Sequence, residues 1–344
     1  MDAHLDLVAL GECMVRLSPP GAGRIEFART LEVDVGGGEY NVAYALARMG
    51  AKTGFVSRLP MSPVADIILN HARAVGMDLS YVHRVPYDGV GRENRVGLYF
   101  AEIGTGVRGG MALYDRGHSS ASELDPTDVN WAHLFQSTGA KWLHSGGIYA
   151  VLSENSRRTL QFAISKAREH GTQISYDLNF RAALATPAAA AAINREFVAQ
   201  SDLLIGSEAG FQALLDESST KLQGKPLLNS VFEKFPNLRW IAGTDRTLHQ
   251  ANRQDFYGFA ADRVNHVQSR IYSQMEVIDR VGTGDAFGAG LLWGLIQGRS
   301  LQESVEIGAA HGALVHTTRG DVSQFSLAEI EDLANSRKSL AMAR

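Results

Sequence analysis

The residues with the clearest chemical potential lie near the end of the chain, where a glycine-rich turn leads to an aspartate. Residues 279–290 read Asp-Arg-Val-Gly-Thr-Gly-Asp-Ala-Phe-Gly-Ala-Gly, and the small residues after Asp285 predict that a helix begins there. Free backbone N–H groups in such a turn, together with the helix N-terminus, favour the binding of a phosphate. A carboxylate beside that site can accept the proton of an attacking hydroxyl. Asp285 is therefore a candidate general base, and a plain N-cap role is its alternative.

Two familiar nucleotide-binding patterns do not fit this chain. A dinucleotide fingerprint needs glycine at its sixth position, where Phe287 stands, and it belongs to an early strand–helix–strand unit. A Walker loop needs Gly-Lys-Ser/Thr after its glycines, and the chain has no such run.

His144 and His311 are candidate metal ligands, but neither has a second histidine at ligand spacing with a carboxylate. We therefore predict packed or hydrogen-bonded histidines.

Strands and helices alternate over most of the chain and must position the turn. Short apolar runs predict strands at 5–11, 53–57, 141–145, 173–178, 202–205 and 240–242. Helical spacing of apolar residues, with glycine or proline at the ends, predicts helices after glycines 36–38, at 63–75 and 153–170, from Pro187, and from about 285 and 301. Repeated strand–helix units predict an α/β protein whose helices cover both faces of a mostly parallel sheet.

Two segments break this alternation. Residues 95–101 and 111–116 alternate with the period of a strand, so that Tyr99 faces away from its apolar neighbours and Tyr114 shares a face with Arg116. With residues 13–36 they predict a small, half-exposed β lid. The predicted organisation is a core of residues 1–12, 37–90 and 119–344, and a lid of residues 13–36 and 91–118.

The segment 279–290 resembles the C-terminal signature of the ribokinase-like (PfkB) sugar kinases. The N-terminal signature of that family is matched at 36–50, where Gly-Gly-Gly-Glu-Tyr-Asn-Val-Ala is followed by Leu-Ala-Arg-Met-Gly after two residues. The signatures occur in the family's order, and the likeness extends over about residues 7–333. It implies the three-layer α/β/α ribokinase-like fold with a β-sheet lid, and ATP and Mg²⁺ as cofactors. Asp285 would be the base, and Gly282, Thr283 and Gly284 would form an anion hole.

Within the family, the likeness is closest to 2-keto-3-deoxygluconate kinases. Four stretches carry it, at residues 11–19, 97–102, 114–121 and 176–181. It implies that the first signature and the lid bind the sugar acid, whereas the second signature and the strand ends bind ATP. The implied sugar-acid contacts are Gly37, Gly38, Glu39, Asn41, Tyr99, Tyr114, Arg116, Arg181, Asp285 and Asp321. The implied nucleotide contacts are Asn179, Arg181, Ser207, Thr244, Arg246, Gly282 and Gly284.

The chain departs from the family pattern at two places. The Asn-x-x-Glu element that helps to place magnesium is replaced at 207–210 by Ser-Glu-Ala-Gly, where Glu208 is the carboxylate that could substitute. The usual Lys-x-Gly-x-x-Gly nucleotide loop is replaced at 242–246 by Ala-Gly-Thr-Asp-Arg, which resembles the Thr-x-Arg version of some sugar-acid kinases. Asp279 begins a segment that binds a monovalent cation such as K⁺ in several relatives, so a cation is implied there too.

Composition bounds the kind of partner. The 344 residues have a net charge of -4, so we expect no nucleic-acid or membrane partner, because such proteins usually have a basic excess. Cys13 is the only cysteine, which fits a reducing compartment. The chain has no basic signal segment and no apolar run long enough to span a bilayer. We expect a soluble, cytoplasmic protein, and a homo-oligomer, because an exposed lid sheet favours covering its face or edge.

These patterns predict transfer of the γ-phosphoryl group of Mg-ATP to 2-keto-3-deoxygluconate, which gives 2-keto-3-deoxy-6-phosphogluconate. Arg116 would bind the acid's carboxylate through two parallel hydrogen bonds, in bidentate geometry. A neutral sugar would leave that buried guanidinium unpaired, which would weaken its binding. Two alternatives stay open. The chain could be a kinase of a neutral sugar or a nucleoside on the same fold, or a non-catalytic sensor of a sugar acid or nucleotide, which the altered 207–210 element permits.

Overall fold

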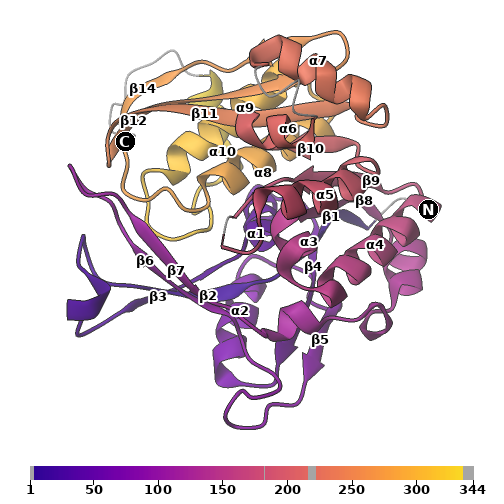
Figure 1. The fold of residues 1–344 in the computed structure, drawn as a ribbon, viewed down its shortest axis with the longest axis vertical. Coiled ribbons are helices and arrows are strands. Elements are labelled where there is room, and N and C mark those ends of the chain that lie inside the picture. The colour runs from indigo at the N-terminus through magenta and orange to yellow at the C-terminus, as the bar shows by residue number, and fades with distance from the viewer. Residues whose placement is uncertain (1–3, 182, 216–221, 336–344) are drawn as a thin grey trace.

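A computed structural model describes residues 4–181, 183–215 and 222–335, which form a large sheet between helices with a smaller sheet at one side (Figure 1). The strands of the large sheet are β1 (Leu5–Leu10), β4 (Thr53–Pro60), β5 (Val82–Val85), β8 (Ala140–Gly146), β9 (Gln173–Asp177), β10 (Leu203–Ile205), β11 (Trp240–Gln250), β12 (Arg253–Ala261), β13 (His266–Gln268) and β14 (Tyr272–Glu276). Among the described residues their order is β13-β12-β11-β10-β9-β8-β1-β4-β5, with β14 also paired to β12. The strands from β5 to β11 are parallel, whereas β12 pairs antiparallel with β11, β13 and β14.

Alternate residues of the central strands face two separate cores. On β1, Leu7 and Ala9 pack into one core, and Val8 and Leu10 into the other. The first core lies under α1 (Gly38–Arg48), α2 (Pro63–Arg73), α8 (Thr283–Ile296) and α9 (Leu301–Val315), and α10 (Leu327–Asn335) packs against α9. The second lies under α3 (Gly147–Leu152), α4 (Glu154–Glu169), α5 (Pro187–Val198), α6 (Glu208–Leu214) and α7 (Gly224–Lys234). The predicted three-layer α/β/α fold is confirmed.

Helix ends follow signals that are visible in the sequence. Thr186 caps α5, because its hydroxyl accepts the N–H of Ala189 at 3.3 Å, and Pro187 is the first helical residue. α1 ends just before Gly50, whose φ of 93° lies in the left-handed region that glycine adopts readily. The start of α5 and the end of α1, which holds the first signature, therefore follow from local sequence.

The sequence analysis assigns no element to several segments that form helices or strands, namely α3, α6, α7, α10, β5 and β12–β14. β11 is also longer than predicted, since it extends from Trp240 to Gln250. Its first half is buried, but residues 245–250 are exposed and pair antiparallel with β12 beyond the parallel part of the sheet. The apolar run predicts only the buried half of the strand. Arg246, which the sequence analysis placed in a loop after that run, therefore lies within β11.

The smaller sheet consists of β2 (Met14–Ser18), β3 (Glu32–Gly36), β6 (Leu98–Glu102) and β7 (Met111–Asp115), in the order β3-β2-β6-β7. These strands fall within residues 13–36 and 91–118, and Figure 1 shows them extending to one side of the core. Met111 and Leu113 on β7 are exposed, and a homo-oligomer that would cover them stays a prediction. Cys13 lies at the root of this lid, buried against Gly37.

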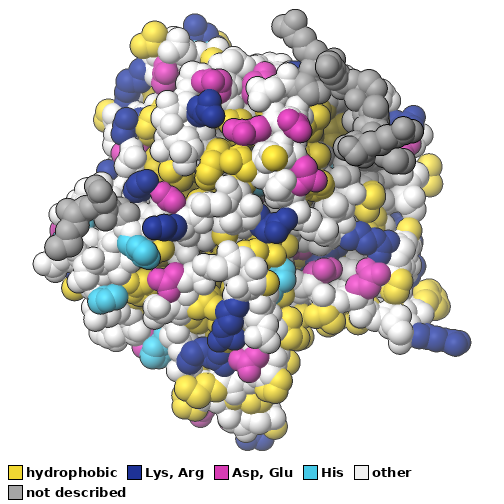
Figure 2. Space-filling view, turned by 180° about the vertical axis from the view of Figure 1, so that it is seen from behind, with side chains coloured by type: hydrophobic (Ala, Val, Ile, Leu, Met, Phe, Trp, Pro, Cys, Tyr) yellow, Lys and Arg dark blue, Asp and Glu magenta, His cyan; other side chains and the backbone are white. Residues whose placement is uncertain are grey.

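The two histidines considered as metal ligands are hydrogen-bonded inside the protein, as predicted. Nδ1 of His144 lies 3.0 Å from Oγ of Ser175, and Nε2 of His311 lies 2.6 Å from Oγ of Ser323. The space-filling view from behind shows basic and acidic side chains interspersed over that face (Figure 2). No helix in the described ranges is both long enough and apolar enough to cross a membrane.

Candidate active site

A cavity of about 670 Å³ opens where the carboxyl ends of β9 and β10 and the middle of β11 meet the start of α8 and the lid. Ligands of open α/β sheets bind at this end of the strands. All residues assigned to sugar-acid or nucleotide binding by resemblance line this one cavity, although they come from segments far apart in the chain. The fold therefore brings the candidates together, and their individual roles stay predictions.

The start of α8 changes the interpretation of Asp285. The helix begins at Thr283 with Gly282 as its N-cap (φ 78°), so Asp285 lies in the first turn and the N-cap alternative is wrong. Among the described residues, the backbone N–H groups of Gly284 and Asp285 have no acceptor, which leaves them available to an anion. A Cβ on Gly282 would lie 1.7 Å from the carbonyl oxygen of Asp321, so this tight turn requires glycine.

The carboxylate of Asp285 is held by α1. Asn41 donates from Nδ2 to Oδ2 of Asp285 at 2.6 Å, and the N–H of Gly37 donates to Oδ1 of Asn41 at 3.2 Å, which orients the amide. Burial raises the pKa of Asp285 to about 7; the hydrogen bond from Asn41 opposes this shift, and the charge of Asp177 adds to it. A carboxylate with this pKa can accept a proton near neutral pH.

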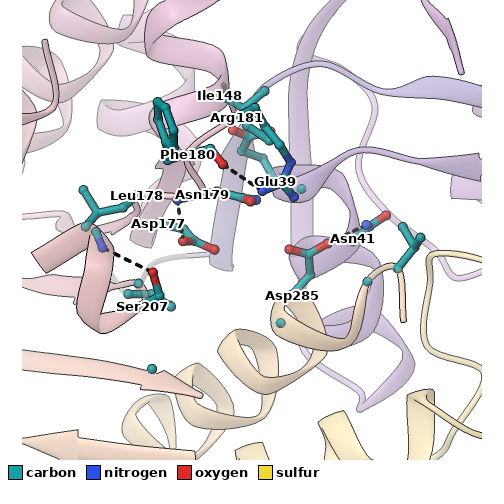
Figure 3. Close-up of a pocket in the computed structure, with 18 of the residues that line it drawn as sticks. Glu39, Asn41, Ile148, Asp177, Leu178, Asn179, Phe180, Arg181, Ser207 and Asp285 are labelled. Carbon is teal, nitrogen blue, oxygen red and sulfur yellow. Dashed lines mark hydrogen bonds between the residues drawn. The ribbon is translucent and has the colours of Figure 1, made fainter. Parts of the chain in front are cut away.

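A second carboxylate, that of Asp177, faces the same space as Asp285 (Figure 3). Asp177 ends β9, and its Oδ1 accepts the N–H of Asn179 at 3.0 Å. Burial raises the pKa of Asp177 to about 6. Arg181 is exposed, and its Nη1 donates to the carbonyl of Phe180 at 3.1 Å, which leaves further N–H groups for a ligand. The sequence analysis places Asp177 in the likeness at 176–181 but assigns it no role.

The lid forms the other end of the cavity, and its side chains are more constrained than predicted. Tyr99 is 2% exposed, its hydroxyl donates a short hydrogen bond to Asp321, and its ring stacks on Tyr114 with centroids 5.6 Å apart. Arg116 is buried and forms an ion pair with Glu12. The prediction of an unpaired guanidinium is therefore wrong. Glu12 lies next to β1, far from Arg116 in the sequence, so no local pattern indicates the pair.

Glu39 lies at the same end and adds a third ionisable group. It is 4% exposed and lines the cavity. Burial raises the pKa of Glu39 to about 8, although the charge of Arg116 lowers it. Near pH 7 this end therefore holds a Glu12–Arg116 pair and a mostly protonated Glu39.

Comparison with known proteins decides the family. The model of the pfkB family carbohydrate kinases matches residues 4–326. The chain belongs to the PfkB family. This PfkB kinase is therefore a phosphotransferase that uses a carbohydrate alcohol as acceptor.

Two curated relatives of this PfkB kinase carry names of sugar-acid kinases. The 2-dehydro-3-deoxygalactonokinase of Haloferax volcanii is 30% identical over 326 residues, which cover 95% of each chain. The 5-dehydro-2-deoxygluconokinase of Bacillus licheniformis is 25% identical over 336 residues, which cover 96% of each. The crystal structure of the 2-dehydro-3-deoxygluconokinase of Thermotoga maritima superposes with a TM-score of 0.89 at 33% identity and covers 97% of this chain and 99% of that one. The confirmed ribokinase-like fold thus has neighbours that act on sugar acids.

The altered 207–210 element of this PfkB kinase does not place Glu208 in the site. Ser207 caps α6, because its Oγ accepts the N–H of Gly210 at 3.2 Å. Glu208 instead accepts the N–H of Gly224 at 2.7 Å and does not line the cavity. The suggestion that Glu208 replaces the missing carboxylate is wrong for this structure. Asp177 lines the cavity and is the better candidate.

Basic side chains line the nucleotide side of the cavity. Thr244 and Arg246 lie two residues apart on β11 and so share a face of the strand. Arg280, just before the α8 turn, joins them, and burial together with the charge of Arg246 lowers its pKa. The two arginines suit a polyphosphate. The sequence analysis named Thr244 and Arg246 as nucleotide contacts but not Arg280.

In the segment that resembles a monovalent-cation site, Asp279 is paired with the guanidinium of Arg16. Nη2 of Arg16 donates to Oδ2 of Asp279 at 2.6 Å, and Nη1 donates to Oδ1 of Asp321 at 2.9 Å. Asp321 therefore lines the cavity with its carboxylate already bound by Arg16 and Tyr99. Dependence on K⁺ stays a prediction.

Proposed function

We propose that this PfkB kinase phosphorylates a 2-keto-3-deoxy sugar acid, with 2-keto-3-deoxygluconate as the preferred substrate and its 6-phosphate as the product. The observation that carries the proposal is the place of Asp285, whose carboxylate lies between the free amides of the α8 turn and the lid end of one cavity. A hydroxyl bound at the lid end would meet the base and the phosphoryl group together. The names of the relatives support the acid class, since 2-dehydro and 2-keto denote the same group.

In the proposed reaction, the hydroxyl oxygen of the sugar attacks the γ-phosphorus of ATP in line. Its proton passes to Asp285, and the bond to the β-phosphate oxygen breaks to release ADP. The amides of Gly284 and Asp285 would stabilise the charge of the transferring group. The lid would exclude water, which otherwise competes as the acceptor.

The cavity suits a magnesium ion that arrives with ATP. Mg²⁺ usually keeps several waters and is bound by one or two carboxylates together with substrate phosphates. The described residues include no cluster of three or more metal-binding side chains, but Asp177 and Asp285 both face the space between the turn and β9 (Figure 3). Asp177 would help to hold the ion. When bound, Mg²⁺ neutralises charge on the triphosphate.

Preference for an acid would depend on Arg116 and Arg181. Because Glu12 already pairs with Arg116, a neutral sugar would not leave a buried charge alone, and its penalty is smaller than for an unpaired guanidinium. The remaining N–H groups of Arg116 and the exposed Arg181 supply donors for a carboxylate. Glu39, mostly protonated near pH 7, would not repel the acid.

The test is a panel of acceptors with ATP, followed by the release of ADP. The panel contains 2-keto-3-deoxygluconate, 2-keto-3-deoxygalactonate, 5-keto-2-deoxygluconate, fructose, ribose and adenosine. We expect the 2-keto-3-deoxy acids to exceed the neutral acceptors by at least about tenfold in kcat/KM. Preference for a neutral acceptor would contradict the acid class but leave a PfkB kinase. Tight nucleotide binding without turnover of any acceptor would favour the sensor.

A further inference from the structure

Arg16 is a charged side chain sealed between the lid and the core. It lies on β2, beside Tyr99 of β6, and is 1% exposed. All three nitrogens of its guanidinium are used: Nε donates to Oγ of Ser18 at 2.8 Å, Nη1 to Oδ1 of Asp321 at 2.9 Å, and Nη2 to Oδ2 of Asp279 at 2.6 Å. Arg16 does not line the cavity, so any effect on the reaction must act through these partners.

Its two carboxylate partners hold the turn that precedes α8. Oδ1 of Asp279 accepts the N–H of Val281 at 3.1 Å, one residue before Gly282. On the other side of the turn, the carbonyl oxygen of Asp321 packs so closely against Gly282 that a Cβ there would lie 1.7 Å away. Arg16 therefore joins the segments on both sides of Gly282.

The same network reaches the sugar end of the cavity. The carboxylate of Asp321 also accepts the hydroxyl of Tyr99 and packs against Gly36, where an added Cβ would lie 2.0 Å from Oδ2. Both Tyr99 and Asp321 line the cavity. Asp321 thus contacts the lid and the first glycine signature with its carboxylate, and the α8 turn with its backbone carbonyl.

Charge gives Arg16 a second effect. Two carboxylates behind a turn that binds an anion would oppose the negative phosphoryl group, and such opposition is strong where water is excluded. The guanidinium offsets part of this charge, and the charges of Asp321 and Asp279 in turn hold Arg16 protonated by raising its pKa. A lysine has the charge but not the planar geometry that spans both carboxylates.

We propose that Arg16 is a positioning residue for phosphoryl transfer: when the lid strand docks, its guanidinium fixes the Gly282 turn and offsets the charges of Asp279 and Asp321. The lid then completes the anion site as well as covering the sugar. This inference rests on the proposed role of the α8 turn but not on the identity of the sugar.

The test compares Arg16→Gln with Arg24→Gln, using whichever acceptor the wild type phosphorylates fastest. Arg24 forms ion pairs with Glu26 and Glu102 within the lid and is a matched control for the loss of a lid guanidinium. We expect kcat of Arg16→Gln to fall roughly 10- to 100-fold, less than the loss of a direct oxyanion donor, while Arg24→Gln stays within about twofold. Arg16→Lys should recover only part of kcat. Wild-type kcat in a folded Arg16→Gln protein would overturn the proposal.

Two further measurements separate positioning from a general loss of stability. Asp279→Asn combined with Arg16→Gln should have a higher kcat than Arg16→Gln alone, because the charge left unbalanced is removed. Methylguanidinium should restore kcat of Arg16→Ala with saturation, whereas methylammonium should not. If Arg16→Gln does not fold, the cycle is run from Arg16→Lys. Additive losses without rescue would overturn the proposal; full activity of Asp285→Asn would instead contradict the base assigned under the proposed function.

Discussion

The two ends of the cavity differ in the chemical groups that line them. At the proposed phosphoryl end, the free amides of Gly284 and Asp285 lie in a turn that requires glycine at position 282, and Arg246 and Arg280 line the same side of the cavity. The lid end is mainly buried charge, as the Arg116–Glu12 pair and Glu39 show. Most substitutions change a side chain and leave the backbone N–H in place, and only proline removes that donor. We therefore expect the phosphoryl end to determine whether transfer occurs and the lid end to determine which sugar receives the group.

The largest effect should come from Asp285, the proposed base at the phosphoryl end. Asp285→Asn keeps the shape of the residue but cannot take the proton, so kcat should fall roughly 10²- to 10⁴-fold while ATP binding stays close to wild type. Steady-state kinetics and calorimetric titration with ATP measure the two quantities. Asp255→Asn, at a half-buried aspartate of β12 that lies outside the cavity and pairs with His249, is the control. Turnover above about a third of wild type would show that Asp285 is not the base.

The pH dependence should report the same group. Because burial raises the pKa of Asp285 to about 7, its carboxylate becomes protonated as the pH falls through 7 rather than near its usual value. We therefore expect kcat/KM to fall about tenfold for each pH unit below 7 and to level off above it. Asp177→Asn should move the fall to lower pH, since the charge of Asp177 contributes to the shift. A flat profile between pH 5 and 7 would contradict this assignment.

A change at the lid end should alter the choice of sugar more than the chemistry. Arg116→Ala should lower kcat/KM for 2-keto-3-deoxygluconate by roughly ten- to a hundredfold, the range of a charge-assisted hydrogen bond, and fructose much less. The double variant Arg116→Ala/Glu12→Gln controls for the carboxylate left buried without its partner. Glu12→Gln alone should sharpen preference for the acid, because it leaves the guanidinium charge without its neutralising partner. Equal losses for acid and neutral sugar on Arg116→Ala would remove the acid assignment.

The smallest effect concerns magnesium. Asp177→Asn should raise the Mg²⁺ concentration for half-maximal activity by up to about tenfold, because a proposed partner of the ion is lost. Glu208→Gln should leave the titration unchanged, since Glu208 binds the N–H of Gly224 outside the cavity. The two variants differ only in which carboxylate is removed. A shift with Glu208→Gln and none with Asp177→Asn would reverse the assignment.

The same contrast explains what the sequence predicts well. The α8 turn is determined by glycines within a few residues of Asp285, so its presence, and the prediction that it binds an anion, follow from local rules. Its finer geometry does not, because the N-cap is Gly282 rather than Asp285 and the clash that requires glycine there comes from Asp321. The alternation of strands and helices likewise predicts the three layers, but not the exposed extension of β11.

The lid end is harder to predict because its partners are distant in the chain. Arg116 and Glu12 are 104 residues apart, and Arg16 is 263 and 305 residues from the two carboxylates that it bridges. No periodicity relates such positions. The family resemblance, rather than strand alternation, assigned Tyr99 and Tyr114 to the pocket, and both line the cavity. Neither signal could show that Tyr99 is hydrogen-bonded to Asp321.

The buried Cys13 can report local opening at the root of the lid. A thiol reacts as the thiolate and only when a reagent can reach it, and burial raises the pKa of this thiol as well as covering it. Because Cys13 lies between β1 and β2 at the root of the lid, alkylation requires that root to open locally. Because the chain has one cysteine, the rate constant of its labelling reports how often this region opens, and no engineered tag is needed. Ligands that hold the lid against the core should slow the labelling, so one mass-spectrometric time course can rank acceptors by closure rather than by turnover.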